Sequence, residues 1–268
     1  MAQICKIYSI SRQSYYKGIK RQAEQKLKEV IILEMVQNIR KQMPRIGSKK
    51  LYILLTQEMD FGQLNIGRDA FMDILRANGL FVKRKRQYAK TTDSSHRFKV
   101  YGNLIKGMSV TKKDEVYVSD ITYIRTKEKF GYLALVTDLY SRKIVGFDFS
   151  DSLALEGSVR ALKMSLKGKT ITDLTHHSDR GIQYCSNVYI EILKKNHIKI
   201  SMSEKGNPYE NAVAERVNGI LKEEFGLSET FKTLKMAKKA IIEAIRIYNE
   251  LRPHMNINML TPNKKYAA

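Results

Sequence analysis

The chain has 268 residues, and its 48 Lys and Arg outnumber its 27 Asp and Glu to give a formal net charge of +21. An excess of this size indicates a polyanionic partner, most simply a nucleic acid. Two cysteines exclude a disulfide framework and a four-thiolate zinc site, and they fit a reducing cytoplasm. We see no signal peptide and no apolar run of the roughly 20 residues that a spanning helix needs, so we expect no membrane partner.

The amino-terminal 100 residues carry most of the charge excess, with 21 basic and 8 acidic side chains. Apolar spacing predicts helices over residues 22–42, 49–59 and 67–78. Ser48 is the expected N-cap of the second helix, and Arg68 and Arg76 lie on the third. Two short consecutive helices fit a helix-turn-helix-like region over 1–81, with any small helical bundle as the alternative. The charge excess favours contact with DNA.

Residues 82–110 form the expected basic linker. Four cations follow one another near its start, namely Lys83, Arg84, Lys85 and Arg86. Such a run is usually a solvated tether, and in a chain of this charge it can also hold DNA phosphates without reading sequence.

A change of pattern near residue 114 marks a second region, 111–268. β-branched and aromatic residues predict strands over 116–124, 132–138, 143–149, 173–178 and 198–202. Helices are expected over 154–167, 186–195, 207–224 and 233–250. Short connections make the first three strands an antiparallel meander. The later alternation of helix and strand predicts a mixed α/β sheet with helices on both faces.

Three acidic residues on different elements of this region are candidates for a metal site. Asp120 lies within the first strand, Asp179 follows the fourth strand, and Glu215 lies on the long helix. Carboxylates from separate elements can hold two divalent ions about 3.5–4 Å apart for an in-line displacement at a phosphodiester. The alternatives are a solvent-facing Asp120, whose face the neighbouring residues do not settle, and a turn or capping role for Asp179.

The long helix offers a polar face for this site. Its apolar stripe turns inward, so Glu215 points to the other side together with Asn211, Asn218 and Lys222. By itself this face is a solvated one, but it can also line a cleft in which Asn211 and Lys222 touch DNA.

Other polar groups near these acids have more ordinary interpretations. We expect Asp138 to form a turn and Glu210 to cap a helix or support a loop. Adjacent strand residues point to opposite faces, so His177 is a possible site-lining group and His176 a structural one.

A resemblance to a known family rests on four segments in this order: SDITYI (119–124), DLYSRKIVG (138–146), HSDRGIQY (177–184) and GNPYENAVAE (206–215). They resemble the integrase-type catalytic core of bacterial insertion-sequence transposases, in particular the second-reading-frame product of the insertion-sequence-three family. The tail YNELRPH (248–254) and the upstream RIGSKKL (45–51) also fit. Two positions depart from the family pattern, which has Trp where this chain has Tyr117 and Asp where it has Glu210.

The resemblance implies a ribonuclease-H-like fold in which Asp120, Asp179 and Glu215 match the Asp-Asp-Glu triad. It also implies two Mg²⁺ (or Mn²⁺) ions and a homo-oligomeric transpososome on double-stranded DNA, comprising the element ends and the target. An upstream-frame helix-turn-helix protein is a possible fusion or partner, and the expected location is the bacterial cytoplasm, on the nucleoid.

The expected function is therefore that of a DNA transposase, which cleaves strands and transfers them by metal-dependent phosphoryl transfer. Two alternatives stay open. One is a nuclease on the same core that only hydrolyses DNA, and the other is a DNA-binding regulator derived from such an enzyme.

Overall fold

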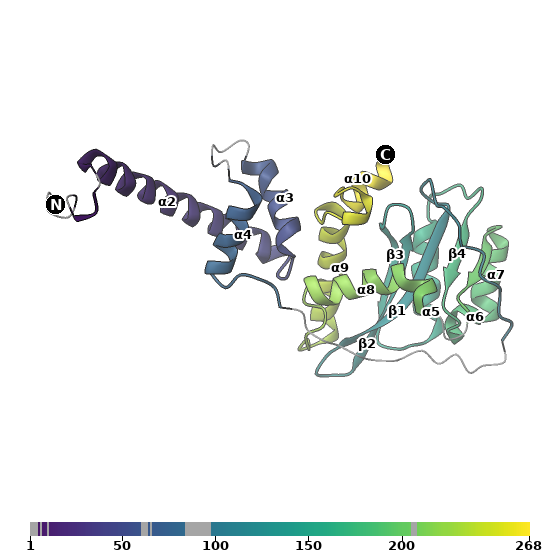
Figure 1. The fold of residues 1–268 in the computed structure, drawn as a ribbon. Helices are drawn as coiled ribbons and strands as arrows, with labels where there is room; N and C mark the ends of the chain where they lie inside the picture. The colour runs from purple at the N-terminus through teal and green to yellow at the C-terminus, as the bar shows by residue number, and fades with distance from the viewer. Residues whose placement is uncertain are drawn as a thin grey trace. The chain divides into compact units, whose positions relative to one another are not determined.

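The computed structural model describes residues 5, 7–9, 11–59, 64, 66–83, 98–204 and 208–268. The chain divides into two compact units, Met1–Lys83 and Arg84–Ala268 (Figure 1). Within the described ranges, no helix combines the length and the apolar character needed to cross a membrane.

The first unit begins with a helix that is longer than the sequence analysis predicts. This helix, α2, spans Arg12–Gln42, so it starts ten residues before the predicted boundary. Its N-cap is Ser11, whose Oγ accepts a hydrogen bond from the Ser14 backbone N–H at 3.0 Å. A serine cap satisfies one of the free N–H groups in the first turn and fixes where the helix begins.

Two shorter helices, α3 (Ser48–Met59) and α4 (Arg68–Ala77), complete the first unit close to their predicted positions. Ser48 is the first helical residue rather than the expected cap, because the Gly47 carbonyl accepts the N–H of Leu51 at 3.1 Å. The core of the unit is formed by buried apolar side chains from all three helices: Ile32, Val36, Leu51, Leu55, Phe71 and Leu75.

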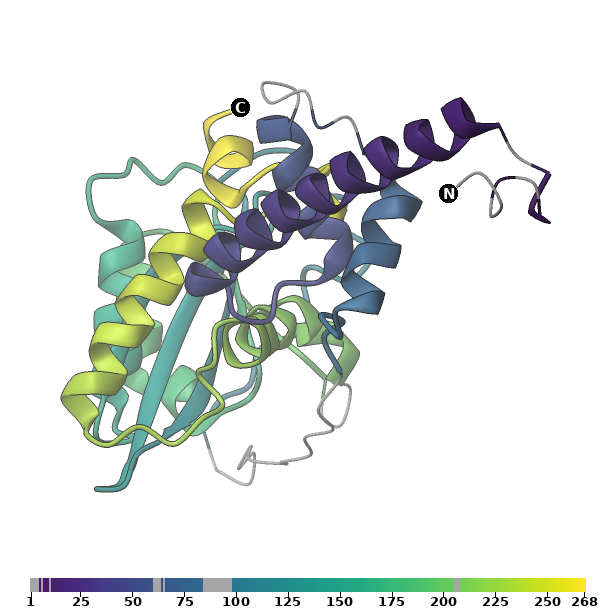
Figure 2. The same cartoon turned by 90° about the vertical axis from the view of Figure 1, so that its left-hand side faces the viewer.

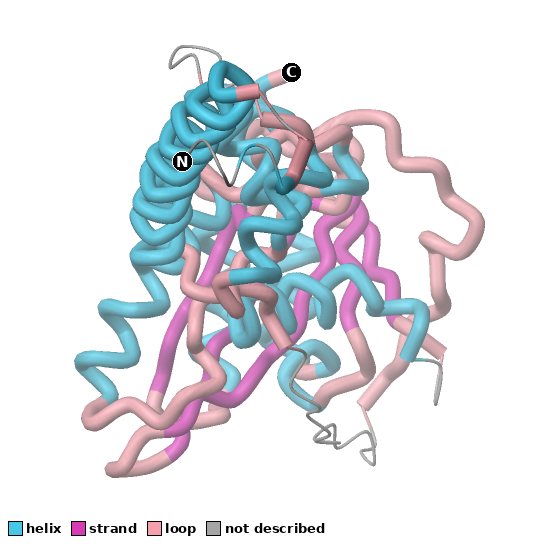
Figure 3. The backbone as a smooth tube through the Cα atoms, turned by 60° about the vertical axis from the view of Figure 1, so that its left-hand side comes forward, coloured by secondary structure: helices cyan, strands magenta, loops and turns pink. Residues whose placement is uncertain are grey.

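A five-stranded mixed sheet with the order β3-β2-β1-β4-β5 forms the centre of the second unit. Its strands are β1 (Val116–Arg125), β2 (Phe130–Asp138), β3 (Ile144–Ser150), β4 (Thr175–Ser178) and β5 (Lys199–Met202). β1 pairs antiparallel with β2, and β2 with β3, whereas β4 runs parallel to both β1 and β5. The predicted meander and mixed sheet are confirmed. Figure 3 marks the strands in magenta.

Helices cover both faces of this sheet (Figures 1 and 2). They are α5 (Leu155–Leu166), α6 (Ile182–Cys185), α7 (Asn187–Lys195), α8 (Ala212–Glu224), α9 (Leu234–Glu250) and α10 (Pro262–Ala267), with short 3-10 turns at Pro208–Asn211 and Met255–Ile257. One core joins the sheet to α5, α6 and α7, and a second joins it to α8 and α9. α5 comes unusually close, because a Cβ on Gly146 of β3 would lie 2.2 Å from the Ala161 carbonyl oxygen.

The segment after the undescribed residues 84–97 is not a free tether. The N–H of Leu104 donates to Ser201 Oγ at 2.8 Å, and the N–H of Met202 donates to the Gly102 carbonyl at 3.2 Å. Residues 102 and 104, in the range expected to be linker, thus hydrogen-bond to β5. The irregular alternation of small and apolar residues in this range does not predict these contacts.

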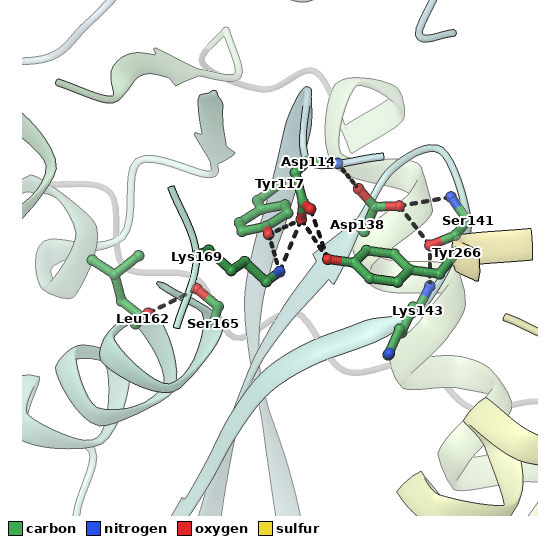
Figure 4. Close-up of polar contacts among 9 residues, drawn as sticks. All are labelled: Asp114, Tyr117, Asp138, Ser141, Lys143, Leu162, Ser165, Lys169 and Tyr266. Atoms are coloured by element: carbon green, nitrogen blue, oxygen red, sulfur yellow. Dashed lines mark hydrogen bonds and ion pairs between the residues drawn. The ribbon is translucent and has the colours of Figure 1, made fainter. Parts of the chain in front are cut away.

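A polar cluster ties the carboxyl-terminal helix to the start of β1 (Figure 4). Asp114 accepts hydrogen bonds from the hydroxyls of Tyr117 and Tyr266 and from the ammonium of Lys169, at 2.8 Å for Lys169 and 2.7 Å for Tyr266. Asp138 accepts from the backbone N–H groups of Ser141 and Asp114 at 2.8 and 2.9 Å. Asp138 therefore forms the expected turn. We call Asp114, Tyr117, Lys169 and Tyr266 the Asp114 cluster.

Candidate functional site

Asp120 faces α8. The alternate residues Val116 and Val118 of β1 pack on Ala214 of α8, and Asp120 has the same parity. Its Oδ2 accepts a hydrogen bond from Asn218 Nδ2 at 2.8 Å, and its Oδ1 accepts from the backbone N–H of Ile121 at 2.9 Å. The carboxylate is therefore half-buried between strand and helix, and the solvent-facing alternative is wrong.

Asp179 lies beside Asp120 at the carboxyl end of β4. The parallel register pairs Ser119 with Ser178, so each acid follows its partner directly along neighbouring strands. Asp179 Oδ1 accepts the N–H of Gly181 at 2.9 Å. A Cβ on Gly181 would lie 3.0 Å from that same oxygen, so the glycine lets the chain close tightly around the carboxylate.

Glu215 lies in the first turn of α8, and its side chain is exposed. The rest of its predicted face is not solvated. Asn211 and Asn218 are each 5% exposed. Asn211 Nδ2 donates to the Ser119 carbonyl at 3.2 Å, and Asn218 binds Asp120. The two amides hold α8 against β1, which brings Glu215 close enough for its charge to act on Asp120 and for that of Asp179 to act on Glu215.

Burial and neighbouring acidic charges raise the pKa values of Asp120 and Glu215. Burial raises the pKa of Asp120 to about 7, with further increases from Asp179 and Glu215, while the hydrogen bonds from Asn218 and Ile121 lower it. Burial and then Asp179 raise the pKa of Glu215. Acids that destabilise one another's charged forms in this way are typical of functional sites.

The pKa of the neighbouring Lys222 is shifted as well. Burial lowers the pKa of Lys222, while the charge of Asp120 raises it and that of Arg125 lowers it. Lys222 is half-buried next to the acids rather than on an open face. In the described ranges, no group of three His, Cys, Asp or Glu side chains is close enough together to hold a metal ion.

The adjacent histidines have separate structural partners. His176 Nε2 lies 2.8 Å from Ser119 Oγ and 3.0 Å from the Tyr189 hydroxyl, and His177 Nδ1 lies 2.8 Å from Ser201 Oγ. Burial lowers both pKa values, to about 3 for His176 and about 4 for His177, so both rings are neutral at physiological pH. The predicted opposite faces are confirmed.

Glu210 has the predicted loop role. Its Oε2 accepts the backbone N–H of Glu204 at 2.6 Å. This bond holds the two described ends of the connection between β5 and α8.

The residues predicted to contact DNA lie in different environments. Arg68 and Arg76 are exposed on α4 and pair with Asp69 and Asp73 on the same helix, while Lys83 is exposed after it. Arg84, Lys85 and Arg86 lie outside the described residues. The contacts expected of these residues, and of Asn211 and Lys222, stay predictions.

The sequence analysis missed a buried ion pair that fixes the end of α8. Arg252 is 1% exposed, and its Nε and Nη2 each donate to a Glu224 carboxylate oxygen at 2.8 Å. A planar bidentate pair of this kind fixes both partners in one orientation. It joins the last turn of α8 to the second residue after α9, and it thereby supports the helix that carries Glu215. The only sequence signal was the RPH tail.

Comparisons with known proteins agree with this architecture. Two integrase core domain models match residues 110–208 and 196–262. The insertion element IS600 uncharacterized 31 kDa protein of Shigella sonnei is 32% identical over 97% of this chain and 96% of that protein. The transposase InsF for insertion sequence IS3A of Escherichia coli (strain K12) is 33% identical over 71% of this chain and 67% of that protein. The chain belongs to the insertion-sequence-three (IS3) family of transposases.

The transposase shares its fold with one chain of a solved intasome structure. A chain of the cryo-EM structure of the simian T-cell lymphotropic virus intasome in complex with PP2A regulatory subunit B56 gamma aligns with a TM-score of 0.50. That match covers 83% of this chain and 71% of the other at 16% identity. It confirms the ribonuclease-H-like class of fold. The integrase core domain matches and the InsF relative show that the transposase is an enzyme of the polynucleotidyl transferase type.

Proposed function

We propose that this transposase cleaves DNA strands and transfers them at Asp120, Asp179 and Glu215, in a reaction that depends on divalent cations. The observation that carries the proposal is that β1, the end of β4 and the first turn of α8 bring three acids together, so that the charges of Asp179 and Glu215 add to burial in raising the pKa of Asp120. Bringing negative charges together costs free energy, and a bound cation offsets that cost.

The residues fit such ions chemically. Carboxylate oxygens are the donors that Mg²⁺ and Mn²⁺ prefer, and these three come from β1, the loop after β4 and α8. Asp120 would be shared between two ions, with Asp179 and Glu215 holding one each. Because Glu215 is exposed, a change of its rotamer is the simplest way for the third carboxylate to reach the other two. Two bound ions supply an activated oxygen nucleophile and neutralise charge at the leaving oxygen.

The protein itself positions the reacting groups. In the first step, the oxygen of water bonds to phosphorus while the bond to the 3′-oxygen breaks, which leaves a 3′-hydroxyl and a 5′-phosphate. In the second step that 3′-hydroxyl attacks a target phosphodiester, so one such bond forms as another breaks. Asn218 and the Ile121 N–H hold Asp120 in place, and Gly181 holds Asp179. This chemistry requires positioning and charge neutralisation rather than a covalent intermediate on the protein.

DNA carrying the element ends, with one 3′ end labelled, tests the proposal in the presence of Mg²⁺. We expect Glu215→Gln to abolish both cleavage and strand transfer. Glu223→Gln, which alters an exposed acid on the same helix, is the matched control and should keep both activities. If Glu215→Gln cleaves and joins DNA as the parent does, the proposal is wrong. Cleavage without joined products would instead favour the hydrolytic nuclease, and metal-independent binding without cleavage would favour the regulator.

A further inference from the structure

An apolar stripe runs along the amino-terminal half of α2 on a face that the first unit does not cover. Tyr16, Ile19, Leu27 and Val30 are 56%, 46%, 63% and 60% exposed, and Ala23 between them is exposed as well. At about 100° per residue, the five side chains fall within an arc of roughly 80°. A stripe with this three-and-four spacing is typical of a helix that packs against another helix.

The stripe is separate from the face that α2 buries within its own unit. Ile32 and Val36 are the buried side chains of α2, and they lie roughly 160° around the helix from the stripe. Figure 2 shows α2 as one continuous helix, drawn in purple. The residues before Ile32 therefore present large apolar side chains to solvent, along a helical segment that has no buried side chain to support it.

The spacing of the apolar residues along the stripe indicates what covers it. Around Ala23, apolar residues lie four positions away on each side (Ile19 and Leu27) and seven positions away on each side (Tyr16 and Val30). A sequence that is symmetric about one residue matches itself when a second copy runs antiparallel, because a two-fold axis then passes at that residue. Ala23 has the smallest side chain of the five, and it would let the two helices approach closely at the axis.

The charges along α2 select the antiparallel direction. Residues 12–21 contain four cations and no acid, whereas residues 24–34 contain three glutamates and two lysines. At the two ends of the stripe, Arg12 and Glu34 lie eleven positions before and after Ala23 on the same side of the helix. An antiparallel pair places Arg12 of each copy opposite Glu34 of the other, whereas a parallel pair places like charges together.

We propose that a second copy of this chain covers the stripe, in an antiparallel pair of α2 helices centred on Ala23 and closed by Arg12 and Glu34 at each end. This interface does not depend on the chemistry at Asp120. It would join two transposase chains through their first units.

Cross-linking of the full chain tests the position of the axis. In the proposed pair, the thiols that Ala23→Cys introduces in the two chains face each other. Opposed positions in packed helices are close enough for a disulfide. We expect this variant to form a covalent dimer under mild oxidation. Gln25→Cys lies on the opposite side of the helix at the same level and is the control, since both native cysteines are buried. Equal cross-linking of the two variants would overturn the proposal.

Charge reversal tests the direction of pairing by sedimentation equilibrium. We expect Arg12→Glu and Glu34→Arg each to weaken dimerisation roughly tenfold, because each creates two like-charge contacts in a homodimer. An equimolar mixture of the two variants should dimerise as the parent does, since only the mixed pair has opposite charges at both ends. Lys28→Glu, away from the stripe, should have no effect.

Three outcomes would contradict the antiparallel pair. They are a monomeric parent at tens of micromolar, a dimer that Leu27→Asp leaves intact, and a mixture of the two charge variants that stays as weak as either alone. Leu27 is exposed, so Leu27→Asp should leave the fold of the first unit unchanged, which circular dichroism would check.

Discussion

Two acids close together in the sequence, one before β1 and one within it, show opposite electrostatics. Asp114 precedes β1, and Asp120 lies six residues further along the chain. Asp114 is surrounded by donors, and hydrogen bonds from Lys169, Tyr117 and Tyr266 outweigh its burial to lower its pKa. Burial, and then the charges of Asp179 and Glu215, raise the pKa of Asp120 to about 7.

The opposite pKa shifts distinguish Asp114, which stabilises the fold, from Asp120, for which we propose a function. The Asp114 cluster satisfies its carboxylate within the chain and joins α10 to the sheet, so its charge already contributes to folding. At Asp120 a buried carboxylate lies near two other acids, which is unfavourable and is not needed for folding. A ligand of positive charge is the simplest reason to keep it.

The largest expected effect is on activity at Asp120. We expect Asp120→Asn to lower strand cleavage at least 10³-fold, about 4 kcal/mol in activation free energy, because it removes a shared ligand. Its free energy of unfolding without metal should equal or exceed that of the parent, since the repulsion with Asp179 disappears. Chemical denaturation and a cleavage assay would measure both. A strongly destabilised Asp120→Asn would place Asp120 among the stabilising acids instead.

The matching change in the Asp114 cluster should have the opposite profile. We expect Asp114→Asn to lower the free energy of unfolding by about 2 kcal/mol, because the half-buried Lys169 loses its ion pair and Tyr117 part of its hydrogen bonding. Cleavage per folded molecule should stay within twofold of the parent. Loss of activity without loss of stability would contradict the structural role.

The pH dependence of stability should distinguish the two acids. Because the folded pKa of Asp120 is raised to about 7, the folded chain binds a proton that the unfolded chain releases above about pH 4. Relative to Asp120→Asn, the metal-free parent should therefore gain about 3 kcal/mol as the pH falls from 7 to 4.

Asp114 has a lowered pKa, so its contribution is present above about pH 4 and is lost only as the pH falls through the folded value. The stability difference between the parent and Asp114→Asn should then stay level from pH 7 to 5. Urea unfolding at several pH values, in the presence of a chelator, gives both curves. Parallel curves for the two variants would show that the two acids do not differ.

A smaller effect is expected from the loop that holds Asp179. We expect Gly181→Ala to lower cleavage several-fold, because its Cβ, 3.0 Å from Asp179 Oδ1, must displace that oxygen by a few tenths of an ångström. Gly219→Ala on α8 is the control, since a Cβ there meets nothing within 4 Å. Steady-state cleavage rates that are equal for the two variants would remove Gly181 from the account.

Much of the second unit was predictable because its signals are local. Runs of β-branched residues fixed β1, β2 and β3, and the four motifs identified the acids. The amino-terminal part of α2 was missed because Ser11 is a weak local signal and the stripe that starts at Tyr16 faces solvent.

The contacts that the sequence could not predict are distant along the chain. The face of Asp120 is set by Asn218, 98 residues away, and strand alternation alone left it open. This contact, and that of Asn211 with the Ser119 carbonyl, explain why the two amides are buried although they lie opposite an apolar stripe. Arg252 and Glu224 are 28 residues apart, and neither suggests a buried partner locally.

We propose that a divalent cation binds at Asp120 and not at Asp114. Thermal unfolding of the parent, Asp120→Asn and Asp114→Asn, each with and without millimolar Mg²⁺ or Mn²⁺, tests it most directly. A ligand that binds only the folded state raises the melting temperature. We predict that the cation raises it for the parent and for Asp114→Asn but not for Asp120→Asn. An equal rise in all three proteins, or none in the parent, would contradict the account.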